Sequence, residues 1–204
     1  MRRAAFLERI RAQLRRSGDP PVPPAPHPSP EARSRAAADA PVARFRERLK
    51  ELEVTLFPVA SREAARRSVG ALVEERGWAT TCAPASLRWP GLPGAWVDES
   101  REAQFGLAEA RWALAETGTV VLDNRGEAAR GHSLLPAASG FLVAESRILP
   151  RLGDALRRLA AAPDDLPACV SFVSGPSNTA DISGVRCVGV HGPAEVFVWL
   201  IAGE

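Results

Sequence analysis

Cysteine is scarce in this chain: among 204 residues there are only three cysteines, Cys82, Cys169 and Cys187, far apart in the sequence. Zinc and iron–sulfur sites need cysteines clustered at short spacings, and this chain has no such cluster. We therefore expect that the chain itself binds no metal and no cofactor. Isolated cysteines in apolar segments serve most often as small core residues.

Long apolar runs are absent as well. No segment approaches the roughly 18 uninterrupted apolar residues of a membrane-spanning helix, so we expect no transmembrane segment. An Arg-rich amphipathic stretch follows Met1 where a signal peptide would have its apolar core, which argues against secretion and for the cytoplasm. A content of 46% hydrophobic and 25% charged residues is that of a soluble globular protein.

Lysine is nearly missing, because Lys50 is the only one and almost all positive charge is arginine. Residues 1–53 hold 12 Lys and Arg against 7 Asp and Glu, a balance of +5, and the remainder holds 14 against 17, a balance of −3. The basic residues alternate with acidic ones, and no aromatic platform accompanies them. This pattern indicates a solvated helix face and no nucleic-acid partner.

The first 52 residues have the pattern of an N-terminal helical arm. A helix is predicted over residues 2–16, and seven prolines within 19–30 then predict an extended polyproline strap. A second helix is predicted over 31–52, with a break near Pro41. Its apolar face carries Val42, Phe45, Leu49 and Leu52.

From residue 53 onward, strands alternate with helices. Strands are predicted at 54–57, 78–82, 95–97, 140–144, 169–173, 186–190 and 196–201, and helices at 61–76, ended by Gly77, and at 150–161. The segment 111–122 predicts two β-like runs joined by a bend or hairpin at Thr117 and Gly118. Residues 53–204 should therefore form a layered α/β domain with a mostly parallel sheet.

Three polar, glycine-bearing bends lie at 116–119, 174–181 and 189–193, and ligands of α/β sheets bind in such loops beyond the carboxyl ends of strands. The second bend follows a segment that predicts a buried strand. Asn178 is a suitable helix N-cap there, with Asp181 as its acidic partner. Backbone N–H groups at such a turn would suit an anion.

If the three bends converge, they form a site for a small molecule. Glu116 would supply a carboxylate and His191 a group that titrates near neutral pH, which makes these two the catalytic candidates. The remaining candidates, for binding an anionic ligand, are Thr117, Gly118, Thr119, Ser174, Gly175, Ser177, Asn178, Thr179 and Asp181.

Each candidate also has a purely structural interpretation. Glu116 could satisfy local N–H groups, His191 could be a turn residue bonded to backbone, and Asp181 could be a helix-terminal acid. Arg130, His132 and Ser133 form a fourth and weaker candidate, in which Arg130 could clamp a carboxylate. We prefer the structural interpretation there, because exposed arginines are frequent in this chain. No catalytic Ser–His–Asp signature, phosphate-binding Walker loop or dinucleotide glycine fingerprint is present.

Four strings, at 113–122, 133–136, 174–182 and 189–193, together resemble the lactate utilisation protein C family, the short LUD-domain proteins (LutC/YkgG-like). They occur in family order, and the resemblance covers roughly residues 53–204. It implies a fold of the NagB/RpiA/CoA-transferase-like type. It also implies a place in a three-protein system that oxidises L-lactate to pyruvate, in which the other two proteins carry iron–sulfur centres. Ser183 departs from the family, which often has an acid there.

Three hypotheses follow for the function. The chain could be an accessory subunit of a lactate-oxidising iron–sulfur complex that binds a small anionic ligand, with the redox chemistry in its partners. It could be a stand-alone enzyme on a sugar phosphate or an acyl-CoA, with Glu116 as base or nucleophile. It could also be an adaptor whose arm docks on a partner or is exchanged within a homo-oligomer. Whether the chain is itself an enzyme stays open.

Overall fold

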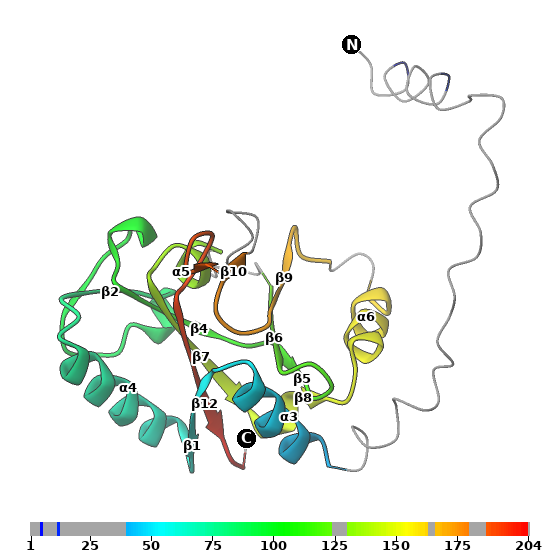
Figure 1. Ribbon diagram of the computed structural model, residues 1–204, viewed down its shortest axis with the longest axis horizontal. Helices are drawn as coiled ribbons and strands as arrows, with labels where there is room; N and C mark the ends of the chain where they lie inside the picture. The colour runs from blue at the N-terminus through cyan, green and yellow to red at the C-terminus, as the bar shows by residue number, and fades with distance from the viewer. Residues whose placement is uncertain are drawn as a thin grey trace. The chain divides into compact units, whose positions relative to one another are not determined.

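The computed structural model describes residues 40–123, 130–162, 166–179 and 187–203, together with Ala5 and Ala12. The chain divides into two compact units, Met1–Ala32 and Arg33–Glu204. Ala5 and Ala12 are helical. The rest of the helix predicted over 2–16 and the whole Pro-rich strap (19–30) lie outside the described residues. The elements below belong to the second unit (Figure 1).

A large sheet of six parallel strands forms the centre of the second unit. In spatial order it contains β1 (Thr55–Val59), β12 (Glu195–Ile201), β7 (Ala138–Ala144), β4 (Phe105–Glu109), β2 (Thr80–Cys82) and β3 (Ala95–Trp96). Strands whose neighbours run the same way need crossover connections, which the intervening helices and loops provide. The predicted α/β fold with a mostly parallel sheet is confirmed.

A smaller sheet of four strands lies beside the large one. It is ordered β8 (Ile148–Leu149), β5 (Trp112–Leu114), β6 (Thr119–Asp123) and β9 (Val170–Val173). Strands β5 and β6 are antiparallel with Leu114 opposite Thr119, and Gly118 has a φ of 66° in their connection. The hairpin predicted at Thr117 and Gly118 is confirmed. The strand predicted at 169–173 is confirmed as β9, but the prediction that it is buried is wrong, because β9 lies at the sheet edge and Phe172 is 41% exposed.

Four α-helices accompany the sheets in the described residues: α3 (Pro41–Glu51), α4 (Arg62–Arg76), α5 (Gly131–Leu134) and α6 (Leu152–Ala160). Short 3₁₀ turns occur at Ala85–Leu87, Ser100–Glu102 and Glu145–Arg147. Helix α4 begins after Ser61, whose hydroxyl accepts the N–H of Ala64, and ends at Gly77 in the left-handed conformation. Both ends agree with the prediction. Helix α3 begins at Pro41, since proline suits the first turn of a helix.

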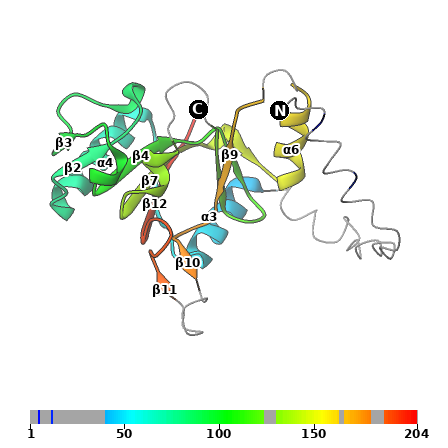
Figure 2. The same ribbon diagram turned by 90° about the horizontal axis from the view of Figure 1, so that it is seen from above.

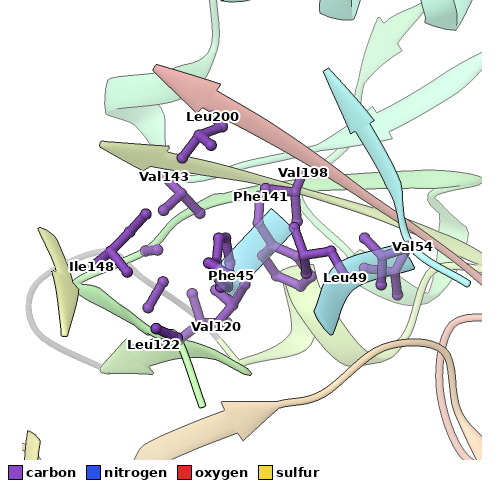
Figure 3. Close-up of a cluster of buried hydrophobic side chains, with 14 residues drawn as sticks. Phe45, Leu49, Val54, Val120, Leu122, Phe141, Val143, Ile148, Val198 and Leu200 are labelled. Carbon is purple, nitrogen blue, oxygen red and sulfur yellow. The ribbon is translucent and has the colours of Figure 1, made fainter. Parts of the chain in front are cut away.

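The core between the two sheets includes helix α3. Phe45 is 0% exposed and Leu49 is 1% exposed, and both pack among strand residues of the two sheets (Figure 3). Val42 and Leu52 pack against the same cluster, so the predicted apolar face of this helix is confirmed. Helix α3, which the sequence pattern assigns to the arm, therefore packs into the core of the second unit. The domain boundary predicted after residue 52 stays a prediction.

The outer faces of the two sheets are covered by different helices. On β12, Val196, Val198 and Leu200 face the core between the sheets. The alternate residues Phe197, Trp199 and Ile201 face α4, as the two-residue period of a strand requires. Helix α6 covers the outer face of the small sheet through Ala155 and Leu159. The layers are thus α4, large sheet, α3 with the inter-sheet core, small sheet and α6 (Figure 2).

Candidate functional site

The first bend, at 116–119, lies where the small sheet meets the start of α6. Strands β5, β8 and β9 point the same way, so their carboxyl ends share one edge. The Glu116 carboxylate accepts the N–H of Leu152, the first residue of α6, through Oε1 at 2.8 Å. The Glu116 N–H donates to the carbonyl of Pro150 at 3.1 Å. One carboxylate oxygen therefore satisfies a local N–H group, as the structural interpretation of Glu116 predicts.

A row of three hydroxyl groups runs from the first bend to the second. The Oγ1 atoms of Thr117 and Thr119 are 2.6 Å apart, and Thr119 Oγ1 is 2.7 Å from Ser174 Oγ. Each hydroxyl has one proton to donate. Two contacts use two of the three protons, so one proton remains for a hydrogen bond outside the row. The first and second bends thus meet, as predicted.

Two glycines let these bends close onto the end of α3. Gly118 and Gly175 have φ angles of 66° and 78°, a region that favours glycine. A Cβ at Gly118 would stand 3.0 Å from Leu52 Cδ1, and a Cβ at Gly175 would stand 3.1 Å from Leu52 Cβ. The guanidinium Nε of Arg48 also donates to the Glu116 carbonyl at 3.1 Å. Helix α3 therefore holds both bends in place.

A cavity of about 360 Å³ opens beside the hydroxyl row. Its surface is almost entirely apolar and comes from α6, β5 and β9, whereas the bends contribute a small polar part. It is lined by Leu114, Glu116, Thr117, Thr119, Leu152, Leu156, Phe172 and Ser174. Four of the residues predicted for the site thus line one cavity.

The third bend, at 189–193, contacts the far end of the second. The N–H of Ser177 donates to the Pro193 carbonyl at 2.9 Å, and the N–H of Gly189 donates to the Ser177 carbonyl at 2.9 Å. The N–H of His191 donates to Ser177 Oγ at 3.3 Å. His191 is exposed, does not line the cavity and lies just ahead of the amino end of β12. The structure therefore separates it from the cavity that Glu116 lines.

The helix predicted to begin at Asn178 is not found there. Asn178–Thr179 is the short strand β10, which pairs antiparallel with β11 (Cys187–Val188) (Figure 2). The Asn178 amide donates to the Pro176 carbonyl at 2.9 Å, within the turn. The N-cap prediction is wrong because strand pairing takes up this segment. Asp181 lies outside the described residues.

The N–H group of Ser177, in the bend expected to face an anion, is thus bonded within the protein, and so is the N–H group of His191. The bend at 189–193 also meets the start of the large sheet. A Cβ at Gly192 would stand 3.2 Å from Ser177 Cβ and 3.9 Å from the carbonyl of Leu134 in α5. The described parts of three strings, 113–122, 174–179 and 189–193, are therefore joined by hydrogen bonds, and Gly192 lies near Leu134 of the fourth.

Two titratable groups are buried on the large-sheet side: His132, which belongs to the weaker fourth candidate, and Cys82. His132 in α5 is 6% exposed, and burial, followed by the charge of Arg88, lowers its pKa. Burial raises the pKa of the Cys82 thiol to about 11, against smaller opposing effects of a hydrogen bond with Ser100 and of Arg88. No sequence pattern distinguished Cys82.

The residues that the structure describes contain neither a metal site nor a membrane-spanning helix. There, His, Cys, Asp and Glu side chains do not gather in any group of three or more that could hold a metal ion. No helix in the described ranges has both the length and the apolar character needed to cross a membrane.

Comparison with known proteins gives a family match. The profile of the LUD domain matches residues 92–201. Over 97 residues the chain is 47% identical to Lactate utilization protein C 1 of Bacillus mycoides, covering 46% of this chain and 42% of that protein. Over 108 residues it is 42% identical to the uncharacterized protein YkgG of Escherichia coli, covering 52% and 46%. The matched segment thus spans a little under half the length of either relative.

A crystal structure of a DUF162 family protein from Deinococcus radiodurans has a similar fold. The TM-score is 0.59 at 23% identity, and the likeness covers 78% of this chain and 94% of that one. The resemblance predicted from the four strings is confirmed by the family match.

Proposed function

This chain belongs to the LUD domain family, and we propose that it is a component of a lactate utilisation system. In this system L-lactate is oxidised to pyruvate in the cytoplasm, with iron–sulfur partner proteins carrying the electrons. The observation that carries the proposal is the sequence match to relatives named Lactate utilization protein C, at 47% identity over 97 residues and 42% over 100 residues.

We place the small anionic ligand, L-lactate, in the cavity at the first two bends. The free proton of the hydroxyl row would be donated to the ligand carboxylate. The hydroxyl of L-lactate would donate to Glu116 Oε2, because Oε1 is occupied by the N–H of Leu152. The positive end of the α6 dipole offsets the negative charge of Glu116 and eases the approach of an anion.

Genetic complementation tests the role in lactate utilisation. Deleting the gene should abolish growth on L-lactate and leave growth on glucose intact, and the wild-type gene should restore it. Isolating the tagged protein from lactate-grown cells should recover iron–sulfur proteins. Normal growth of the deletion strain on L-lactate, with no second copy of the gene, would contradict the proposal.

The stand-alone enzyme is the second candidate, and the position of Glu116 favours it. A carboxylate with one oxygen left over in a cavity can act as a base or nucleophile. Under this alternative the purified protein alone would turn over an acyl-CoA or a sugar phosphate, and Glu116→Gln would abolish the activity. A ligand at 100 times its Kd should stabilise the protein by about 2.7 kcal/mol, so unchanged melting temperatures with these compounds would count against the alternative.

A further inference from the structure

The cavity is larger than a three-carbon acid requires. Pockets of about 300–1,000 Å³ hold drug-sized ligands, and this one measures about 360 Å³. L-Lactate has six non-hydrogen atoms and a single methyl group as its apolar part. A lactate held by Glu116 and the hydroxyl row would leave most of the apolar wall without a contact.

The polar and apolar groups of the cavity lie on different elements. Hydrogen-bonding groups come from the two bends, whereas α6 supplies Leu152 and Leu156 and β9 supplies Phe172. Leu152 and Leu156 are four residues apart and therefore share a helix face. The three side chains are 40%, 49% and 41% exposed. An amphipathic ligand, with its polar end at the bends and its apolar end against α6 and β9, would cover them.

From this arrangement we infer that the cavity selects 2-hydroxy acids whose apolar side chain is larger than the methyl of lactate, such as a branched or aromatic one. The inference rests on the proposed function, since it uses the same cavity and the same polar contacts. Leu156 and Phe172 are the residues that determine the specificity, because both lie on the apolar wall and are partly open to solvent.

The hydroxyl group is part of the recognition. An acid of the same shape without a 2-hydroxyl offers no donor to Glu116 Oε2, and its carboxylate faces the carboxylate of Glu116 with nothing to compensate. The cavity therefore discriminates against simple fatty acids of the same size.

Isothermal titration of the full chain with a graded ligand series tests the inference. The series is L-lactate, 2-hydroxybutanoate, 2-hydroxy-4-methylpentanoate and 3-phenyllactate, with 4-methylpentanoate as the analogue that lacks the hydroxyl. Each buried methylene should tighten binding about fourfold, so 2-hydroxy-4-methylpentanoate should bind tens of fold more tightly than L-lactate. The analogue without the hydroxyl should bind at least tenfold more weakly than its hydroxylated counterpart.

Substitutions in the apolar wall test whether the acids bind in this cavity. Leu156→Ser and Phe172→Thr should weaken the two largest acids by about tenfold or more and L-lactate by much less, because the methyl group reaches little of that wall. Leu166→Ser is the matched control, since Leu166 is 53% exposed and does not line the cavity. It should leave every affinity unchanged. Circular dichroism of each variant verifies that it is folded.

The outcomes separate this inference from the function. If L-lactate binds as tightly as the larger acids, the selectivity is refuted and the lactate function stands. If large acids bind tightly and both wall variants leave them unaffected, binding occurs elsewhere and the inference fails. If no 2-hydroxy acid binds, the inference and the ligand placement both fail, while the growth test on L-lactate still decides the proposed role.

Discussion

The two sheets of this protein are covered to different extents. Strands β7 and β12 of the large sheet are buried along nearly their whole length, between α4 on one face and the inter-sheet core on the other. In the small sheet, edge strand β9 keeps Phe172 41% exposed, and the cavity opens beside it. A sheet buried on both faces uses its side chains for stability, whereas a partly covered sheet leaves apolar surface free for a ligand.

Substitution of Gly106 on β4 should have the largest effect on the free energy of unfolding. A Cβ at this position would stand 1.8 Å from the carbonyl oxygen of His132, a backbone atom of α5. We expect Gly106→Ala to cost roughly 4 kcal/mol or more of the free energy of unfolding, because either α5 or β4 must move. Urea unfolding followed by circular dichroism measures the change.

Gly153→Ala is the matched control on the side of the small sheet. Gly153 lies in α6, and the nearest atom to a Cβ there is Arg157 Nη1 at 3.7 Å. Alanine favours the helix, so this variant should gain about 0.5–1 kcal/mol. Equal effects of the two substitutions would show that the two sheets do not differ in the tightness of their packing.

Truncating one phenylalanine in each environment sharpens the comparison. Phe45 is 0% exposed between the sheets, so Phe45→Ala should destabilise the protein by about 3–5 kcal/mol. Phe172 is 41% exposed, so Phe172→Ala should cost only about 1 kcal/mol. Both values come from denaturant unfolding of the full chain. A loss at Phe172 as large as that at Phe45 would mean that the wall of the cavity is structural.

Two buried groups near the large sheet, Cys82 and His132, should make the free energy of unfolding depend on pH above and below neutrality. Burial raises the pKa of Cys82 from an ordinary 9.0 to about 11 in the folded protein. The neutral thiol therefore stabilises the fold fully below pH 9, and this contribution to the free energy of unfolding is lost as the pH rises toward 11. The loss is at most about 2–3 kcal/mol. His132 has a lowered pKa, so its contribution is complete above about pH 6.5 and falls as pH drops below that value. Unfolding free energies measured across this pH range test both.

Non-titrating variants provide the controls for this pH dependence. Cys82→Ala should flatten the alkaline side of the profile, and His132→Gln should flatten the acidic side, whatever each costs at pH 7. An unchanged slope in either variant would assign that side to another group.

Local sequence patterns predicted the regular elements well. Interactions between residues close in sequence form helix α4, with its Ser61 cap and Gly77 end, and the β5–β6 hairpin. Local sequence patterns can therefore predict both. Strand β4 was not predicted. It is short and contains Gly106, and it is a strand because β2 and β7 flank it and α5 covers it.

The site was predicted in part for the same reason. The polar bends could be recognised individually, and the contact of Thr119 with Ser174 confirms that two of them meet. The apolar wall of α6 and β9 was missed, because each of its side chains has the pattern of an ordinary core residue. The roles of Glu116 and His191 in catalysis stay predictions.

The sequence by itself determined the α/β pattern, the helix ends and the family, since these depend on neighbouring residues and on strings that can be compared directly. Only the tertiary structure decided that α3 enters the core, that His191 lies apart from Glu116, and that leucines of α6 form one cavity with hydroxyls 18 to 39 residues away along the chain. The physical reason is that packing joins surfaces by shape and by the burial of apolar area, and neither quantity is encoded in local spacing.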